Sequence, residues 1–139
     1  QNLQVKYTPT YVYSFENPAN NVHVNWCLHI PDKLEGNFEN KLLKWVERTE
    51  GGLQPNALWC AKINPDAPKS VANYILKGVD SRYADRFYLG DLQARKGHQG
   101  IIIGKRAGFS QSVGITAQRR ADFNPTQYRA QKEWERRNG

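Results

Sequence analysis

The chain has 139 residues and a net charge of +7, with 20 Lys and Arg against 13 Asp and Glu. This length fits a single domain with its own core. The basic balance points to an anionic partner such as nucleic acid, or reflects solubility alone. The two cysteines, Cys27 and Cys60, form no C-x-x-C pair, which excludes a zinc ribbon. Without a signal peptide or a long apolar run, the sequence predicts a cytoplasmic protein that does not enter a membrane.

The N-terminal part predicts an antiparallel β-hairpin. Residues Thr10–Glu16 (TYVYSFE) are rich in β-forming side chains, and so are residues 22–31 (VHVNWCLHIP). The Asn-Pro-Ala-Asn-Asn run between them is typical of a turn. Successive side chains of a strand point to opposite faces, so the second strand has one apolar face and one polar face. The polar face carries two imidazoles, an amide and a thiol: His23, Asn25, Cys27 and His29. In the hairpin, Glu16 would stand beside His23 and Asn25.

Two helices and a further strand are predicted next. Apolar spacings of three and four indicate an amphipathic helix over residues 33–48, closed by Gly51 and Gly52. Residues 56–63 (NALWCAKI) indicate a strand, and residues 70–79 a short helix broken at Gly78. On that helix Tyr74 and Lys77 are three apart and share a face. The pattern also assigns three tryptophans to the core: Trp26, Trp45 and Trp59.

The C-terminal part is basic and rich in glycine. Residues 101–103 indicate a very short apolar strand. Residues 104–114 (GKRAGFSQSVG) combine glycine, serine, Lys105 and Arg106, which suits backbone contacts to phosphate. The run lacks the order of a Walker loop, and a flexible basic loop is the alternative. The tail over residues 116–139 contains Arg119 and Arg120, and part of it, residues 127–137, is expected to be helical.

A divalent metal ion could bind on the polar face of the hairpin. The carboxylate of Glu16, the imidazole of His23 and the amide oxygen of Asn25 form a mixed oxygen and nitrogen donor set, which suits Mg²⁺ or Mn²⁺. Such an ion could polarise a scissile phosphate. The alternative is that these side chains are ordinary hydrogen-bonded sheet residues.

Tyr74 and Lys77 could supply covalent chemistry. A neutral tyrosine hydroxyl is a weak nucleophile, and a neighbouring ammonium or metal ion favours the phenolate. Attack on phosphorus would leave a covalent phosphotyrosine, with Lys77 stabilising the leaving oxygen or the phosphorane. The alternative is that both are common helix-surface residues.

The order of these pieces resembles the HUH endonucleases, which include rolling-circle replication initiators. The resemblance covers roughly residues 11–78. It implies that His23-Val24-Asn25 is the H-U-x metal motif with Glu16 as the third ligand, and that Tyr74 is the nucleophile assisted by Lys77. One position departs from the pattern, because Asn25 stands where the family has His or Gln. His29 could be recruited as an accessory ligand.

The sequence thus predicts an α+β fold, an antiparallel sheet with helices packed on it. Residues 1–115 would form an HUH-like nuclease domain and residues 116–139 a basic extension. The implied function is metal-dependent nicking of single-stranded DNA through a 5′-phosphotyrosine, with a separate helicase for unwinding. The DNA backbone would be held by four basic residues: Lys105, Arg106, Arg119 and Arg120. The alternatives are a nucleic-acid-binding module of the same fold without the chemistry, and a structural or protein-binding domain.

Overall fold

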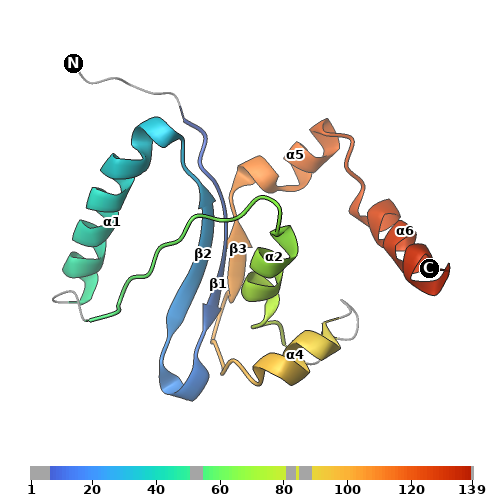
Figure 1. The fold of residues 1–139 in the computed structure, drawn as a ribbon, viewed down its shortest axis with the longest axis horizontal. Coiled ribbons are helices and arrows are strands. Elements are labelled where there is room, and N and C mark those ends of the chain that lie inside the picture. The colour runs from blue at the N-terminus through green and yellow to red at the C-terminus, as the bar shows by residue number, and fades with distance from the viewer. Residues whose placement is uncertain (1–6, 51–54, 81–83, 85–88, 139) are drawn as a thin grey trace.

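The fold is α+β, with a three-stranded antiparallel sheet of order β2-β1-β3 (Figure 1). The computed structural model describes residues 7–50, 55–80, 84 and 89–138. The strands are β1 (Thr10–Glu16), β2 (His23–His29) and β3 (Ala107–Phe109). The helices are α1 (Glu35–Glu50), α2 (Pro68–Leu76), α4 (Gly90–Lys96), α5 (Ile115–Arg120) and α6 (Pro125–Asn138). Within the described ranges, no helix has both the length and the apolar character that a membrane span needs.

The predicted hairpin is confirmed. β1 and β2 pair in a register that sets Glu16 opposite His23 and Ser14 opposite Asn25. A single 3₁₀ turn (Pro18–Asn20) joins the strands. Ala19 and Asn20 there have φ of 52° and 61°, a left-handed geometry that Asn tolerates well. Because register follows the turn, this short connection is what brings the Glu16 and His23 side chains to the same face.

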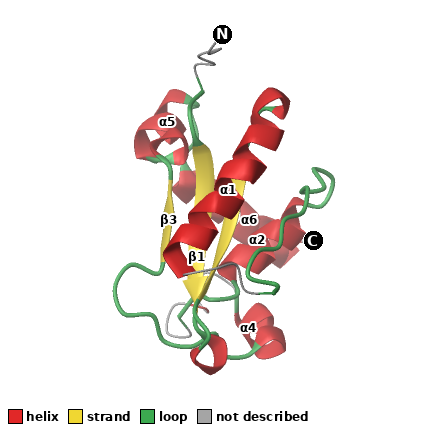
Figure 2. Ribbon diagram, turned by 90° about the vertical axis from the view of Figure 1, so that its left-hand side faces the viewer, coloured by secondary structure: helices red, strands yellow, loops and turns green. Residues whose placement is uncertain are grey.

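The two faces of the sheet are covered by different helices. On the aromatic face, the Trp26 ring lies 5.9 Å from Phe38 of α1, and Phe38 lies 6.3 Å from Trp45. Helix α2 packs on the polar face, where Lys77 reaches Glu16. Figure 2 shows α1 crossing in front of the sheet, with α2 on the far side. The predicted helices over residues 33–48, 70–79 and 127–137 correspond to α1, α2 and α6, within a few residues at each end.

The buried interior is unusually polar. Among the described residues, only Ala84 and Leu92 are buried hydrophobic side chains. The buried polar and charged residues are Ser14, Glu16, Asn25 and Ser110. Since apolar burial is ordinarily the main stabilising term, the polar contacts on the α2 face carry an unusual share of the specificity of this fold.

The predicted strand over residues 56–63 is wrong, and so is the core assignment of three tryptophans. Residues 56 and 57 lie in a turn and a bend, and residues 58–63 have no regular secondary structure and pair with no described strand. Lys62 forms an ion pair of 3.0 Å with Glu35. Trp59 is 79% exposed, and Trp26 and Trp45 are 40% and 47% exposed. A run of apolar and β-forming residues indicates that a segment can form a strand. It does not indicate that a neighbouring strand is available to pair with it.

The third strand lies a few residues later than predicted. Residues 101–103 are not a strand, and β3 falls inside the glycine-rich run for which a loop is expected from sequence. Gly108 is the reason that β3 can pair here. It lies opposite Tyr13, and a Cβ on Gly108 would approach the Tyr13 hydroxyl to 2.6 Å. The pairing therefore selects a glycine-containing segment, although glycine is a poor strand former. The sequence pattern does not predict helices α4 and α5.

The segment between α4 and β3 is fastened to the end of β1. The Asn17 backbone N–H donates to the Gln99 carbonyl at 2.9 Å, and the Asn17 side-chain amide donates to the Ile101 carbonyl at 3.1 Å. Gly100, between them, has a φ of +72°, and a Cβ there would lie 1.8 Å from the Asn17 carbonyl oxygen. Only glycine fits this contact.

We expect Gly100→Ala to lower the free energy of unfolding by more than about 2 kcal/mol, because strain at positive φ adds to a backbone clash. Gly97→Ala is the matched control, since Gly97 has a φ of +69° and a Cβ added there would meet nothing within 4 Å. It should cost about 1 kcal/mol. Urea unfolding followed by circular dichroism measures both, and equal losses would contradict the close packing of Gly100 on Asn17.

Candidate functional site

The site is built around the carboxylate of Glu16, which lies at the end of β1 with none of its surface exposed. Its Oε2 atom lies 2.9 Å from Nε2 of His23 and 3.0 Å from Nζ of Lys77. His23 belongs to β2, and Lys77 is the capping residue that directly follows the last residue of α2. Two motifs far apart in the sequence therefore meet on one oxygen atom.

The His23 ring is held between two acceptors. Its Nδ1 lies 3.2 Å from the Asn21 carbonyl oxygen, and its Nε2 faces the Glu16 carboxylate. A carbonyl and an ionised carboxylate can only accept hydrogen bonds. A neutral imidazole donates from only one of its nitrogens, so a further proton or a cation would join the other nitrogen to its neighbour. The ring is thus placed where either a proton or a metal ion would join it to Glu16.

Lys77 reaches the carboxylate because α2 ends beside β1. Its side chain is only 13% exposed, and its ammonium also lies 4.2 Å from the centre of the Tyr74 ring. The next residue, Gly78, allows this approach, since a Cβ there would lie 3.3 Å from both Cγ and Oε1 of Glu16. Tyr74 is 48% exposed, so its ring faces solvent at the edge of the cluster. One ammonium thus contacts both the buried carboxylate and the exposed phenol ring.

Buried polar atoms without partners continue the site along the same face. Ser14 and Asn25 lie opposite each other in the hairpin, one step along the strands from the Glu16 and His23 pair, and both are buried. Three atoms here have no hydrogen-bond partner among the described residues: Ser14 Oγ, Asn25 Nδ2 and Glu16 Oε1. Buried polar atoms are nearly always satisfied, so this group indicates a place where a ligand, an ion or water belongs.

The residues present fit a hard divalent ion. Two ligands at right angles on an ion with bonds of about 2.1 Å lie about 3.0 Å apart. His23 Nε2 and Glu16 Oε2 have that separation, at 2.9 Å. Glu16 Oε1 is without a partner, and the Asn25 amide lies on the same face. The described residues contain no cluster of three His, Cys, Asp or Glu side chains, so a third protein ligand would be the Asn25 amide oxygen. Burial raises the pKa of the Cys27 thiol, which lies further along the same strand.

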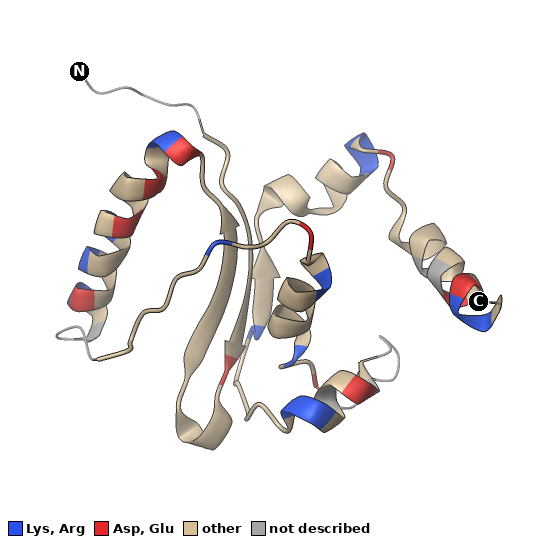
Figure 3. Ribbon diagram, in the orientation of Figure 1, with Lys and Arg blue, Asp and Glu red and all other residues tan. Residues whose placement is uncertain are grey.

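Of the other predicted site residues, His29, Lys105, Arg119 and Arg120 are not in contact with this cluster, whereas Arg106 lies beside it, across Gly78. His29 is at the opposite end of β2, paired with Thr10, where its ring meets Tyr7. Lys105, Arg119 and Arg120 are exposed, the last two at the end of α5 (Figure 3). Arg106 is half-buried, and its guanidinium donates to the Gly100 and Gln99 carbonyls at 3.1 and 2.8 Å.

The sequence does not identify Ser14 and Gly78 as contributors to the site. It also does not predict that Arg106 binds the backbone carbonyls of Gln99 and Gly100. Ser14 has a detectable signal, because it alternates with Glu16 on the same face of β1. Gly78 follows the Tyr74 and Lys77 pair directly, but a glycine after a helix is more often only its cap. No local pattern reveals the contacts that Arg106 makes to the Gln99–Gly100 segment.

We expect Lys77→Met to lower the free energy of unfolding by about 2–4 kcal/mol, because it leaves the buried Glu16 carboxylate without its ammonium partner. The double variant Glu16→Gln/Lys77→Met removes both charges and should recover most of that loss. Urea unfolding measures both. Lys62→Met is the matched control, since its ion pair with Glu35 is at the surface and its loss should not be measurable. A double variant no more stable than Lys77→Met would contradict the ion pair.

No protein-family model matches the chain, and no curated protein or solved structure matches it significantly.

Proposed function

We propose that this protein is a metal-dependent endonuclease of HUH type, which nicks single-stranded DNA through Tyr74 and remains attached to the 5′ phosphate. The observation that carries the proposal is the ion pair of 3.0 Å between Lys77 and Glu16. The Tyr74-x-x-Lys77 helix and the Glu16–His23 hairpin are separate motifs in the sequence. Their meeting on one carboxylate is what a shared active site requires.

The proposed reaction assigns one role to each group. The Tyr74 oxygen forms a bond to phosphorus while the bond from phosphorus to the 3′ oxygen breaks. The phenol loses its proton and the departing 3′ oxygen gains one, so the products are a 5′-phosphotyrosine and a 3′ hydroxyl. The Lys77 ammonium, which lies beside both Tyr74 and Glu16, stabilises the charge that develops on the oxygens. Glu16, His23 and Asn25 would hold the divalent ion, which supplies polarisation of the phosphate.

The exposure of Tyr74 supports its role as the nucleophile. A DNA phosphate must reach the phenolic oxygen, and Tyr74 is 48% exposed while the carboxylate beneath it is fully buried. The exposed residues Lys105, Arg119 and Arg120 would contribute to holding the DNA backbone. Arg106 is occupied with backbone carbonyls, so its part would be to shape the site rather than to bind phosphate freely.

A second function is favoured by a specific observation. The Lys77 ammonium already neutralises Glu16, as a bound cation would, and Asn25 is a weaker ligand than the His or Gln of the family. A protein in which Lys77 has replaced the metal would bind single-stranded nucleic acid without cutting it. The covalent product separates these two functions.

We expect Tyr74→Phe to abolish the covalent protein–DNA product and leave binding of DNA unchanged, because only the nucleophilic oxygen is lost. The assay mixes the protein with a pool of single-stranded oligonucleotides and Mn²⁺, with and without chelator, and resolves the products on a denaturing gel. Tyr128→Phe is the matched control, since Tyr128 is 52% exposed and lies on α6. A covalent product that persists in Tyr74→Phe would remove Tyr74 from the active site. Binding to the same pool without any covalent product would favour the binding module.

We expect the protein to bind Mn²⁺, and His23→Ala to weaken that binding about tenfold or more, because the loss of a ligand removes a bond to the ion. The loss of free Mn²⁺ signal in electron paramagnetic resonance measures binding without any reaction. Asn25→His should hold the affinity or raise it. His29→Ala is the control and should leave Mn²⁺ binding unchanged. Equal affinities of the native protein and His23→Ala would overturn the metal site.

A further inference from the structure

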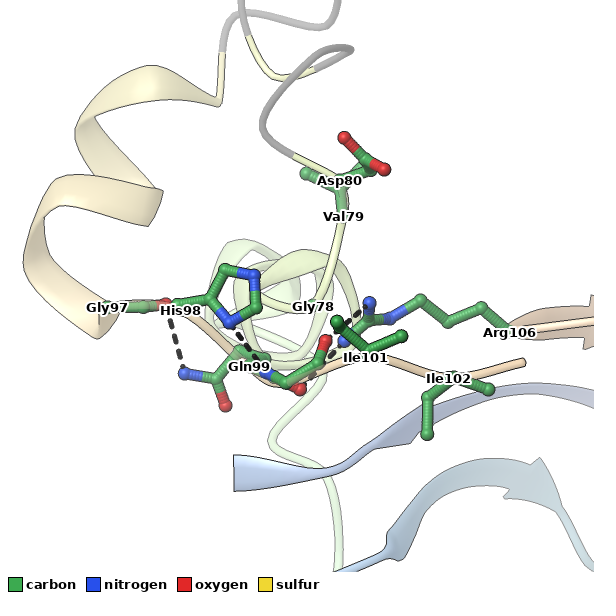
Figure 4. A pocket seen from close by; sticks show the side chains of 10 residues that line it. Gly78, Val79, Asp80, Gly97, His98, Gln99, Ile101, Ile102 and Arg106 are labelled. Atoms are coloured by element: carbon green, nitrogen blue, oxygen red, sulfur yellow. Dashed lines mark hydrogen bonds between the residues drawn. The ribbon is translucent and has the colours of Figure 1, made fainter. Parts of the chain in front are cut away.

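A cavity of about 600 Å³ lies between the end of α2 and the segment that joins α4 to β3. Figure 4 shows His98 at this cavity, the Arg106 side chain reaching it from the residue before β3, and Gly78 behind them. Val79, Ile101 and Ile102 add apolar surface to the lining, and Asp80 adds a carboxylate, which can accept hydrogen bonds from the amino group of a base. The volume is within the range of small-molecule sites, and the mixture of apolar walls with a few polar groups is typical of such sites.

The cavity lies directly beside the Glu16 cluster. Gly78 is the shared wall, since its Cβ position would lie 3.3 Å from Glu16 Oε1 and 3.4 Å from Arg106 Nε. Both of those atoms are buried, and neither has a hydrogen-bond partner in the part of the chain that the structure describes. Gly78 also follows Tyr74 by four residues, so a DNA strand with its phosphate at the exposed Tyr74 would bring a neighbouring nucleotide to this cavity.

Hydrogen bonds from two side chains and one backbone N–H hold the wall of the cavity in place. Arg106 donates to the carbonyls of Gln99 and Gly100, and Asn17 donates to those of Gln99 and Ile101. Because Asn17 follows Glu16 in the chain, the wall and the carboxylate are attached to the same strand end. A site whose backbone is fixed in this way costs little ordering entropy when a ligand binds.

His98 presents a hydrogen-bond donor at the cavity. The Gly100 backbone N–H donates to Nδ1 of His98 at 3.1 Å, so Nδ1 is the acceptor and the ring proton is on Nε2. The Arg106 guanidinium adds positive charge to the same wall. Purines carry the N7 acceptor on one edge and have the larger flat surface for packing on apolar side chains. The donor and the apolar walls together therefore favour a purine base.

We propose that this cavity binds one unpaired purine of the DNA strand, next to the phosphate at Tyr74, and gives the protein a base preference. This inference rests on the proposed action on single-stranded DNA. It assigns a role in base specificity to His98, Ile101 and Arg106, which lie outside both the metal motif and the helix that carries Tyr74.

The test measures binding by the full chain carrying Tyr74→Phe, so that no cleavage intervenes. The probes are short fluorescent oligo-dT strands with one central dA, dG, dC or abasic nucleotide, and anisotropy gives each affinity. We expect the dA and dG strands to bind about tenfold more tightly than the dC and abasic strands. His98→Ala should reduce this preference about fivefold by removing the donor. Ile101→Trp should remove it by filling the cavity, and both side chains are exposed, so the fold should tolerate the changes.

The control is Lys105→Ala, which should weaken binding to all strands by the same factor, because an exposed lysine contacts phosphate and not base. Equal affinity for all strands, or a purine preference that survives both cavity variants, would overturn the assignment. The nuclease proposal is judged separately. If the native protein forms the covalent product on the denaturing gel but the anisotropy assay shows no base preference, the cavity assignment alone is overturned. If the anisotropy assay shows a base preference but the native protein forms no covalent product, the nuclease alone is overturned. No binding to any strand overturns both.

Discussion

The structure depends on the neutralisation of one buried carboxylate. Glu16 has no exposed surface, and a buried charge is costly unless opposite charge and hydrogen bonds meet it. The partners come from different elements, His23 from the adjacent strand and Lys77 from the end of α2. This one requirement therefore determines where α2 can lie on the sheet, and the position of α2 in turn places Tyr74.

The same requirement explains why a polar interior is sustainable here. Ser14 and Asn25 continue the polar face of the hairpin inward, while the aromatic residues of the strands lie on the opposite face against α1. Alternation along two short strands thus separates a binding face from a packing face. The packing face remains partly open, since Trp26 and Trp45 keep much of their surface exposed. The stability of the described part of the fold is accordingly more dependent on its polar contacts than is usual for a chain of this size.

The sequence predicted what depends on local pattern. The hairpin followed from alternation and a turn, and its register then placed Glu16 beside His23. The spacing of Tyr74 and Lys77 put both on one helix face, and the ion pair of Lys77 with Glu16 joined the two motifs. The resemblance supplied the expectation that they belong together, and the structure brings the residues to one place without testing the chemistry.

The remaining features could not be predicted, because they depend on partners distant in sequence. Residues 56–63 have the composition of a strand, but no described strand lies where they could pair. Residues 107–109 form a strand because Gly108 fits against Tyr13, which no propensity reports. The charge of Arg106 suggests phosphate binding, whereas its guanidinium is engaged by backbone carbonyls. Charge alone does not distinguish a side chain that binds a ligand from one that secures a loop.

The way Glu16 is partnered also orders the assembly of the chain. The contact with His23 closes only a short turn, so the hairpin can form early, while the carboxylate is still hydrated. The contact with Lys77 closes a much longer stretch of chain and comes later. Docking of α2 then buries the carboxylate and supplies its counter-charge in the same step. Undocking the helix would strip Glu16 of its ammonium as water returns, so we expect α2 to leave the sheet as a unit, with its amide hydrogens exchanging together.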